Sequence, residues 1–163
     1  MPAGDARVAI RTAATRDIEP LIAHFGLLSL SSRDNRFMGA ADNLSKLASA
    51  CLVSGEGDHF MLVAELRNAD RHAIIGEACY AFDRREGRGE FAISVADQWQ
   101  RRGLGTALLC ALQLRAVALG HFGLFGESLK TNAQMLALAK KAGFVFSRSL
   151  DWRAIRFDKR LVC

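Results

Sequence analysis

Apolar residues alternate with polar ones in several short stretches of the chain and recur every three or four residues in others. Alternation is typical of strands that are buried on one face, and the longer period is typical of amphipathic helices. The first pattern predicts strands at 8–11, 60–66, 74–82, 90–95, 122–129, 144–150 and 154–161. The second predicts helices at 18–25, 44–52, 104–119 and 132–142.

Residues at the ends of these helices suit helix caps. Asp17 is expected to cap the first helix, and Asp42 or Asn43 the second. Asn132 begins the last helix, and Gly143 and Phe144 follow it as a left-handed stop with a hydrophobic contact. The third helix is apolar on most sides, which predicts a central, well-covered helix.

The order of these elements indicates the fold class. A strand, two helices, three strands, a helix, a strand, a helix and two strands predict an α+β fold. We expect a central, mixed and mostly antiparallel sheet of seven strands with helices on both faces. A length of 163 residues fits a single domain, 1–163.

Composition excludes several classes of protein. The net charge of +5 is spread along the chain without interleaved aromatic residues, which argues against a nucleic-acid partner. No run is long enough for a membrane span and the N-terminus has no signal pattern, so we expect a cytoplasmic protein. The histidines are scattered, so no metal site is expected. Cysteines 51, 79 and 110 lie within apolar patterns, which predicts small core residues.

A glycine-containing turn follows the predicted strand at 90–95. The first N–H groups of the next helix have no intrahelical partner, and the helix dipole places partial positive charge there. Gly103 and Gly105 allow a ligand to approach the backbone, Arg101 and Arg102 add charge, and Thr106 adds a hydroxyl. These features predict a site for a phosphorylated ligand.

The type of phosphate site follows from what the turn contains. It lacks the Gly-Lys-Ser/Thr of a Walker loop and the third glycine of a dinucleotide fingerprint. Its Gln-x-x-Gly-x-Gly pattern resembles the coenzyme A pyrophosphate loop of the GNAT acetyltransferase superfamily. The segment Asn132–Phe144, about thirty residues later, resembles that superfamily's other recurring segment. The element order also matches, so the resemblance covers nearly the whole chain.

The resemblance implies an acetyl-CoA-dependent N-acetyltransferase with no metal. The residues it implies for the cofactor are Gln100, Arg101, Arg102, Gly103, Leu104, Gly105 and Thr106 around the pyrophosphate. Asn132 would bond the pantetheine arm or a nearby backbone group. Backbone N–H groups near Ile93, Ser94 and Val95 would hold the thioester carbonyl.

One position departs from the family pattern. Many members carry a tyrosine that reprotonates the departing thiolate, and here that position is Ala139. The chain's one tyrosine, Tyr80, lies on the predicted third strand, so a tyrosine general acid is not expected and water would finish the step.

A general base is expected because few alkylamines are deprotonated at neutral pH. The resemblance points to two glutamates, Glu90 at the start of the fourth strand and Glu127 on the fifth. Apolar neighbours distinguish both from ordinary exposed residues, and Glu90 is slightly favoured.

The acceptor is the least specified part. Residues 29–39, in the polar stretch between the first two helices, resemble a segment of bacterial GNAT domains that acetylate lysines of acyl-CoA synthetases. This favours a protein lysine, but an ordinary helix–helix connection explains the segment equally well. Small-molecule amines therefore stay open, as do a non-catalytic acyl-CoA-binding module, a nucleotide-binding protein and the oligomeric state, including a homodimer.

Overall fold

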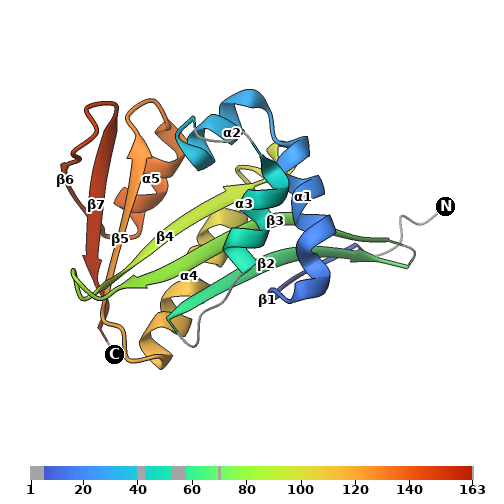
Figure 1. Ribbon diagram of the computed structural model, residues 1–163, viewed down its shortest axis with the longest axis horizontal. Coiled ribbons are helices and arrows are strands. Elements are labelled where there is room, and N and C mark those ends of the chain that lie inside the picture. Colours follow the sequence, from blue (N-terminus) through green and yellow to red (C-terminus); the bar gives the residue numbers. More distant parts are fainter. Residues whose placement is uncertain (1–5, 40–42, 53–57, 70, 163) are drawn as a thin grey trace.

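The computed structural model describes residues 6–39, 43–52, 58–69 and 71–162 (Figure 1). Its strands are β1 (Arg7–Thr12), β2 (His59–Asn68), β3 (Arg71–Asp83), β4 (Arg88–Val95), β5 (Gly123–Leu129), β6 (Val145–Arg148) and β7 (Ala154–Arg160). Its helices are α1 (Ile18–Leu27), α2 (Leu30–Phe37), α3 (Leu44–Leu52), α4 (Leu104–Ala118) and α5 (Ala133–Lys141), with short 3-10 turns η1 (Thr15–Asp17) and η2 (Asp97–Trp99).

The seven strands form one sheet in the order β1-β2-β3-β4-β5-β7-β6. Every neighbouring pair is antiparallel except β4 and β5, which run parallel. That parallel pair is in register at Gly89–Leu124 and Glu90–Phe125, and the ladder ends there. The predicted mixed, mostly antiparallel sheet is therefore confirmed, and its one irregular junction lies in the middle.

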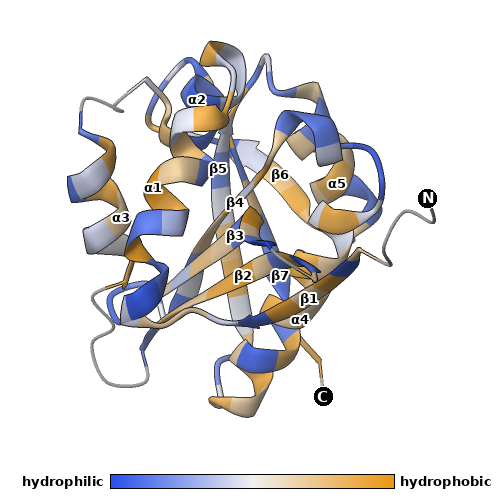
Figure 2. Ribbon diagram, turned by 90° about the vertical axis from the view of Figure 1, so that its right-hand side faces the viewer, coloured by the Kyte–Doolittle hydropathy of each residue, from blue (hydrophilic) through white to orange (hydrophobic). Residues whose placement is uncertain are grey.

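Two hydrophobic cores cover the two faces of the sheet. One is built on Phe60, Tyr80 and Phe91 with the inner faces of α4 and α5, and it contains Leu108 and Leu112. The other contains Leu21 and Phe25 of α1, Ala48 of α3, and Met61 and Val63 of β2. Figure 2 shows α1, α2 and α3 on one side of the sheet and α4 and α5 on the other.

Three expectations from the sequence were wrong. The polar stretch after α1 contains a helix, α2, because Ser29 caps it by accepting a hydrogen bond from the amide of Ser32 at 3.1 Å. Helix α4 is covered on one face only, since Leu114 is 74% exposed. Cys110 lies on that uncovered side and is exposed, so it is not a core residue; the side chain of Cys51 and all of Cys163 lie outside the description.

The helix caps follow the sequence more closely. Asn43 accepts a hydrogen bond from the amide of Lys46 and Asn132 from that of Met135. Asp42 lies outside the described residues. After α5, the amides of Gly143 and Phe144 bond the carbonyls of Lys140 and Ala139, and Gly143 takes a φ of +87°, as in a Schellman motif.

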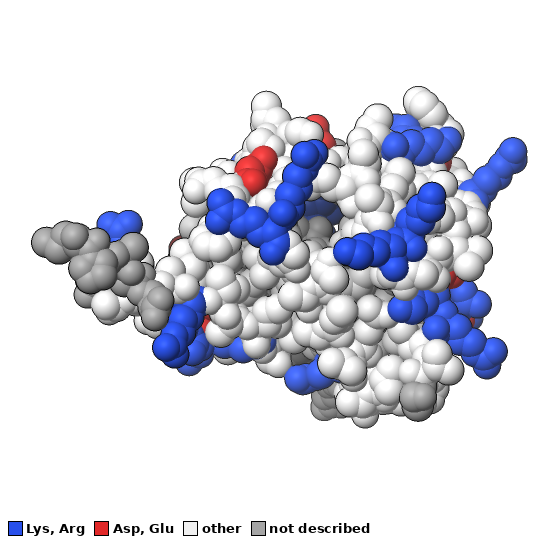
Figure 3. All heavy atoms as spheres, turned by 180° about the vertical axis from the view of Figure 1, so that it is seen from behind, with Lys and Arg blue, Asp and Glu red and all other residues white. Residues whose placement is uncertain are grey.

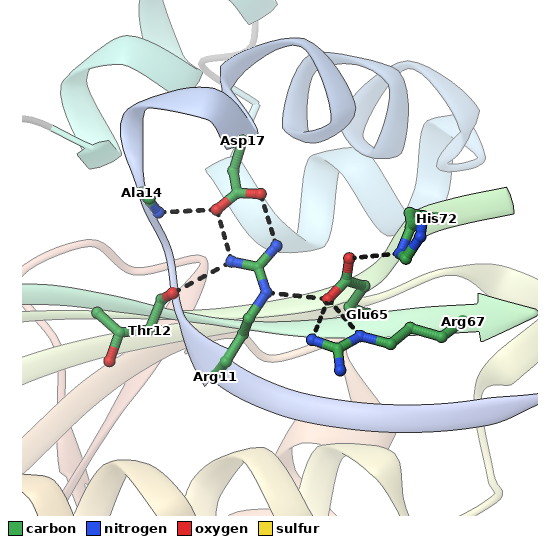
Figure 4. Close-up of polar contacts among 7 residues, drawn as sticks. All are labelled: Arg11, Thr12, Ala14, Asp17, Glu65, Arg67 and His72. Carbon is green, nitrogen blue, oxygen red and sulfur yellow. Dashed lines mark hydrogen bonds and ion pairs between the residues drawn. The ribbon is translucent and has the colours of Figure 1, made fainter.

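Asp17 does stand before α1, but its carboxylate does not cap the helix by a side-chain bond. It accepts two hydrogen bonds from the Arg11 guanidinium, at 2.7 and 2.8 Å, and one from the amide of Ala14 (Figure 4). The same guanidinium donates to Glu65 at 2.9 Å, and Glu65 also contacts Arg67 and His72. This charged cluster ties the start of α1 to β1 and β2.

We expect the charged cluster to make stability depend on pH. The hydrogen bond from Arg11, against the opposing effect of burial, lowers the pKa of Glu65 from near 4.5 to about 2. A lowered carboxyl pKa stabilises the fold above the unfolded-state value, and this contribution is lost as the pH falls from near 4.5 toward 2. Glu65→Gln should reduce the free energy of unfolding at pH 7 by roughly 1–3 kcal/mol, measured by urea denaturation.

The difference between wild type and Glu65→Gln should shrink steadily in denaturation series taken below pH 4.5. Glu19→Gln is the control, because Glu19 is an exposed carboxylate in the first turn of α1. A Glu65→Gln difference that stays constant down to pH 3 would show that the charge of Glu65 contributes little.

Candidate functional site

The turn between β4 and α4 is folded to present backbone amides. Its residues Arg101 and Gly103 have positive φ angles, +61° and +85°, with an ordinary backbone between them. Alternation of this kind turns successive N–H groups toward one side and makes a small anion-binding concavity. A Cβ on Gly103 would meet no described atom within 4 Å, so the space in front of this residue is open.

The N-terminus of α4 adds further donors to this turn. Gly103 is the N-cap and supplies no capping side chain. The first amide with an intrahelical acceptor is that of Ala107, which bonds the carbonyl of Gly103 at 3.0 Å. The amides of residues 104–106 are therefore left for an external acceptor, with the positive end of the helix dipole behind them.

A groove of about 820 Å³ runs from this turn, lined by the end of β4 and by residues that follow β5 from Thr131 onward. Figure 3 shows a hollow on the face behind the sheet with Lys and Arg side chains on both sides. The groove has walls from four parts of the chain: the end of β4, the turn, α2, and α5 with the residues just before it. The described residues of these walls include Ser29, Ser32, Asn35, Arg36, Ile93, Ser94, Val95, Asp97, Gln100, Arg101, Gly103, Gly105, Thr106, Asn132 and Lys141.

Nine of the eleven residues expected at the cofactor lie along this groove: Ile93, Ser94, Val95, Gln100, Arg101, Gly103, Gly105, Thr106 and Asn132. The side chain of Leu104 packs instead on the core between α4 and the sheet. The Arg102 guanidinium lies over the Trp99 ring, 5.0 Å from its centroid. The side chains of these two residues therefore support the turn.

Three of the nine have side chains that are hydrogen-bonded within the protein: Gln100, Asn132 and Ser94, the last in the network described next. Gln100 donates from its amide nitrogen to the Val95 carbonyl at 3.0 Å and to the Ser32 hydroxyl at 3.2 Å. The Asn132 carbonyl oxygen caps α5. Gln100 and Asn132 shape the groove through these bonds.

A buried polar network lies beside the groove at Ser94. The Ser94 hydroxyl donates to Glu77 Oε1 at 2.7 Å, and Arg36 Nε of α2 donates to the same oxygen at 2.6 Å. Glu77 is fully buried, which by itself would raise its pKa. The Arg36 charge and the bonds from Arg36 and Ser94 outweigh burial and hold the pKa of Glu77 below its usual value, so the pair is ionised.

His24 extends this network into α1. Its Nε2 lies 2.9 Å from the Ser94 hydroxyl. Since the one proton of that hydroxyl goes to Glu77, Nε2 must carry the proton that it shares with Ser94. Burial lowers the pKa of His24, so the ring is neutral, and its Nδ1 has no hydrogen-bond partner among the described atoms.

The two candidate bases lie on the α2 side of the sheet, near the point where β4 and β5 part. Glu90 pairs in register with Phe125, and Glu127 follows two residues later on the same face of β5. Both reach solvent, and neither is among the described residues that line the groove. The pKa of Glu90 is raised, mainly because burial of the carboxyl disfavours its charged form. The nearby negative charges of Glu127, Asp83 and Glu86 raise it further, and the positive charge of Arg156 lowers it.

Sequence reasoning named residues 29–39 for their resemblance to lysine-acetylating domains but expected neither a helix there nor its place at the groove. Ser29, Ser32, Asn35 and Arg36 form a wall because α2 is a helix, and Asp97 bonds its N-terminus. The signal was present in the Ser29-Leu30-Ser31-Ser32 sequence, in which Ser29 can cap a helix three residues before Ser32. The described residues contain no group of three His, Cys, Asp or Glu side chains placed to hold a metal ion, and no helix among them could cross a membrane.

Comparisons with known proteins agree with this geometry. Residues 28–144 match the sequence model of the Acetyltransferase (GNAT) family. The fold is similar to that of the GNAT domain of S. lividans PAT, with 24% identity, a TM-score of 0.82 and coverage of 96% of this chain and 90% of that one. No curated protein matched the sequence.

Two other solved structures share the fold. One is the ribosomal-protein-S18-alanine N-acetyltransferase of Escherichia coli, with 20% identity, a TM-score of 0.72 and 96% coverage of both chains. The other is YncA of Salmonella typhimurium, determined with acetyl-CoA, with 19% identity, a TM-score of 0.71 and coverage of 95% of this chain and 94% of that one. With a family match across most of its length, the chain belongs to the GNAT family of acetyltransferases.

Proposed function

We propose that this protein transfers the acetyl group of acetyl-CoA to a primary amine, with a protein lysine as the acceptor. One observation carries the proposal: a turn of unpaired backbone amides opens directly into a groove that runs along the end of β4, beyond the point where its pairing with β5 stops. An anion site that continues into an extended groove suits a pyrophosphate with a long, narrow arm attached to it.

Under this proposal the turn from Arg101 to Thr106 holds the pyrophosphate through its amides. The pantetheine arm lies along the edge of β4 that β5 leaves uncovered, where backbone groups of Ile93–Val95 can bond it and the thioester carbonyl. The same donors would stabilise the oxyanion that forms on that carbonyl. Asn132, which is fixed as the cap of α5, stands beside the arm.

The lysine acceptor is supported by the segment at 29–39. The part of the sequence that resembles lysine-acetylating GNAT domains is also the part that forms the α2 wall of the groove. A small-molecule amine is the alternative, since the groove itself is open enough for either.

The chemistry needs a base and a proton donor. The acceptor ammonium loses a proton, and its nitrogen attacks the thioester carbon. As the C–S bond breaks, the nitrogen loses a second proton to give the amide, and coenzyme A leaves as a thiolate that takes a proton from water. Glu90 is the proposed base, with Glu127 as the competing candidate. Glu90 lies four residues before Ser94, roughly 13 Å along an extended strand, so water would relay the proton.

Binding of acetyl-CoA to the turn can be tested with a matched pair of glycines. Gly103 and Gly120 both have positive φ angles and open space around a Cβ, so valine strains the backbone similarly at either position. We expect Gly103→Val to abolish binding of acetyl-CoA measured by calorimetry, while Gly120→Val, at the far end of α4, keeps wild-type affinity. Equal affinities in both variants would rule out this placement.

The general base can be tested by replacing each glutamate with glutamine. We expect Glu90→Gln to lower kcat by roughly 10²–10⁴-fold with little change in acetyl-CoA affinity. The loss should shrink as the pH rises, because more of the amine is already deprotonated. If Glu127→Gln shows this pattern and Glu90→Gln does not, the two roles are exchanged.

The pH profile provides a second readout on the same pair. Glu127 helps to raise the pKa of Glu90, and a base acts only above its own pKa. Glu127→Gln should therefore shift the acidic limb of the kcat profile to lower pH while most of the activity remains. If the acidic limb of the profile does not shift, the charge of Glu127 has no measurable effect on the pKa of Glu90.

Tyr80 offers a test of the proton donor. Its side chain is 2% exposed, and burial raises the pKa of Tyr80 to about 12. Its hydroxyl contacts His121 Nδ1 at 2.7 Å. Tyr80→Phe should cost about 1 kcal/mol of stability in urea denaturation and leave kcat nearly unchanged. A hundredfold loss of kcat in the folded variant would make Tyr80 the acid.

The acceptor class is tested by thiol release from acetyl-CoA with lysine peptides and with small amines. A kcat/KM at least tenfold higher for lysine peptides supports the protein acceptor, and the reverse supports a small molecule. Binding of acetyl-CoA without release for any acceptor would favour a non-catalytic acyl-CoA-binding module.

A further inference from the structure

Helix α2 is held over the groove mainly by polar contacts. None of its eight residues, all of which the structure describes, is buried, and Leu30 is 78% exposed. Phe37 at its end packs edge-on against Phe25, with ring centroids 5.0 Å apart. Among the described residues, the position of the rest of the helix therefore depends on hydrogen bonds and on the ion pair of Arg36 with Glu77.

The two halves of α2 are attached to different parts of the molecule. In the C-terminal half, Arg36 is bound to the buried Glu77 of β3. In the N-terminal half, the amide of Ser29 donates to Asp97 Oδ1 at 3.1 Å. Asp97 belongs to η2, the short turn that leads into the amide turn at Arg101–Thr106. One end of α2 is thus fixed to the sheet and the other to the proposed coenzyme site.

Ser32 is at the centre of the second attachment. Its hydroxyl donates to Asp97 Oδ2 at 3.1 Å and accepts from Gln100 Nε2 at 3.2 Å. The other proton of the Gln100 amide goes to the Val95 carbonyl at the end of β4. Asp97 and Gln100 lie on either side of Trp99 in the turn, and both bond the same hydroxyl. A change in the turn is therefore transmitted to α2 through Ser32.

We propose that Ser32 is a positioning residue that couples coenzyme binding at the turn to the placement of α2, the acceptor wall. This inference rests on the proposed function of the groove. Phosphate bound to the turn amides fixes residues 101–106, which fixes Gln100 and Asp97, and through Ser32 it fixes the N-terminal half of α2. Because coupling between two sites is reciprocal, a well-placed α2 also tightens coenzyme binding.

Hydrogen exchange measured by mass spectrometry tests this link, with coenzyme A as the probe. In the wild-type protein, we expect coenzyme A to slow amide exchange both in the turn at 101–106 and in α2. In Ser32→Ala, exchange should still slow in the turn, but the slowing in α2 should fall roughly fivefold or more. Coenzyme A affinity should weaken by a smaller factor, since the turn amides are intact.

Two further variants separate coupling from damage to the helix. Ser32→Thr keeps the hydroxyl, so coenzyme A should again slow amide exchange in α2. Gln100→Met removes the amide that donates to Ser32, so in this variant coenzyme A should no longer slow exchange in α2. Asp34→Ala is the control, two residues later on the same helix, with an exposed side chain that does not line the groove. It should behave as wild type, and thermal melts should show that all four variants are folded.

The outcomes distinguish this inference from the proposed function. If coenzyme A slows amide exchange in the turn but not in α2 of the wild-type protein, the coupling is absent, although the proposed coenzyme site is supported. If Ser32→Ala keeps the full slowing in α2, the link runs through other contacts and the role of Ser32 is overturned. If coenzyme A slows amide exchange in neither segment, the proposed coenzyme site at the turn is wrong.

Discussion

The pairing between β4 and β5 lasts for two register positions, Gly89–Leu124 and Glu90–Phe125, and then ends. Beyond that point each strand turns a row of backbone donors and acceptors toward the gap, and such groups need partners. An extended ligand can supply them. Because β4 also leads into the turn with positive φ at Arg101 and Gly103, one interruption of the sheet produces both the groove and the anion site at its mouth.

Buried charge stabilises the wall of this groove. Glu77 lies within the sheet with no exposed surface, and Arg36 reaches it from α2. Removing one partner of such a pair leaves an uncompensated buried charge, which costs about 3–5 kcal/mol in other proteins. Two apolar residues could stabilise the same contact as well, but they would not fix the direction of the helix. The bidentate ion pair between Arg36 and Glu77 fixes that direction. The Arg36 guanidinium also lies over the Phe37 ring, 4.8 Å from its centroid, and this cation–π contact holds it further in place.

The sequence was sufficient to predict elements in which apolar residues recur with a regular period or whose ends carry a capping residue. Every predicted strand was found, and so were the caps at Asn132 and Gly143, because these depend on residues that are neighbours in the chain. Helix α2 was missed because its polar residues leave no apolar stripe, and the ion pair that holds its Arg36 involves a glutamate 41 positions away. The exposure of Leu114 was missed for a similar reason: a helix that is apolar on most sides gives little sign of which face the sheet will cover.

Ala139 shows how the fold limits the chemistry at the leaving group. It is fully buried against the core, and its carbonyl accepts the hydrogen bond from Phe144 that closes α5. A proton donor at this position would have to displace core residues, so the departing sulfur must be protonated from elsewhere. Thiols have a pKa near 8.5, so a thiolate in contact with water at pH 7 takes up a proton readily. Under the proposed function, water in the groove would supply that proton, and a dedicated acid would add little where the leaving group is already stable.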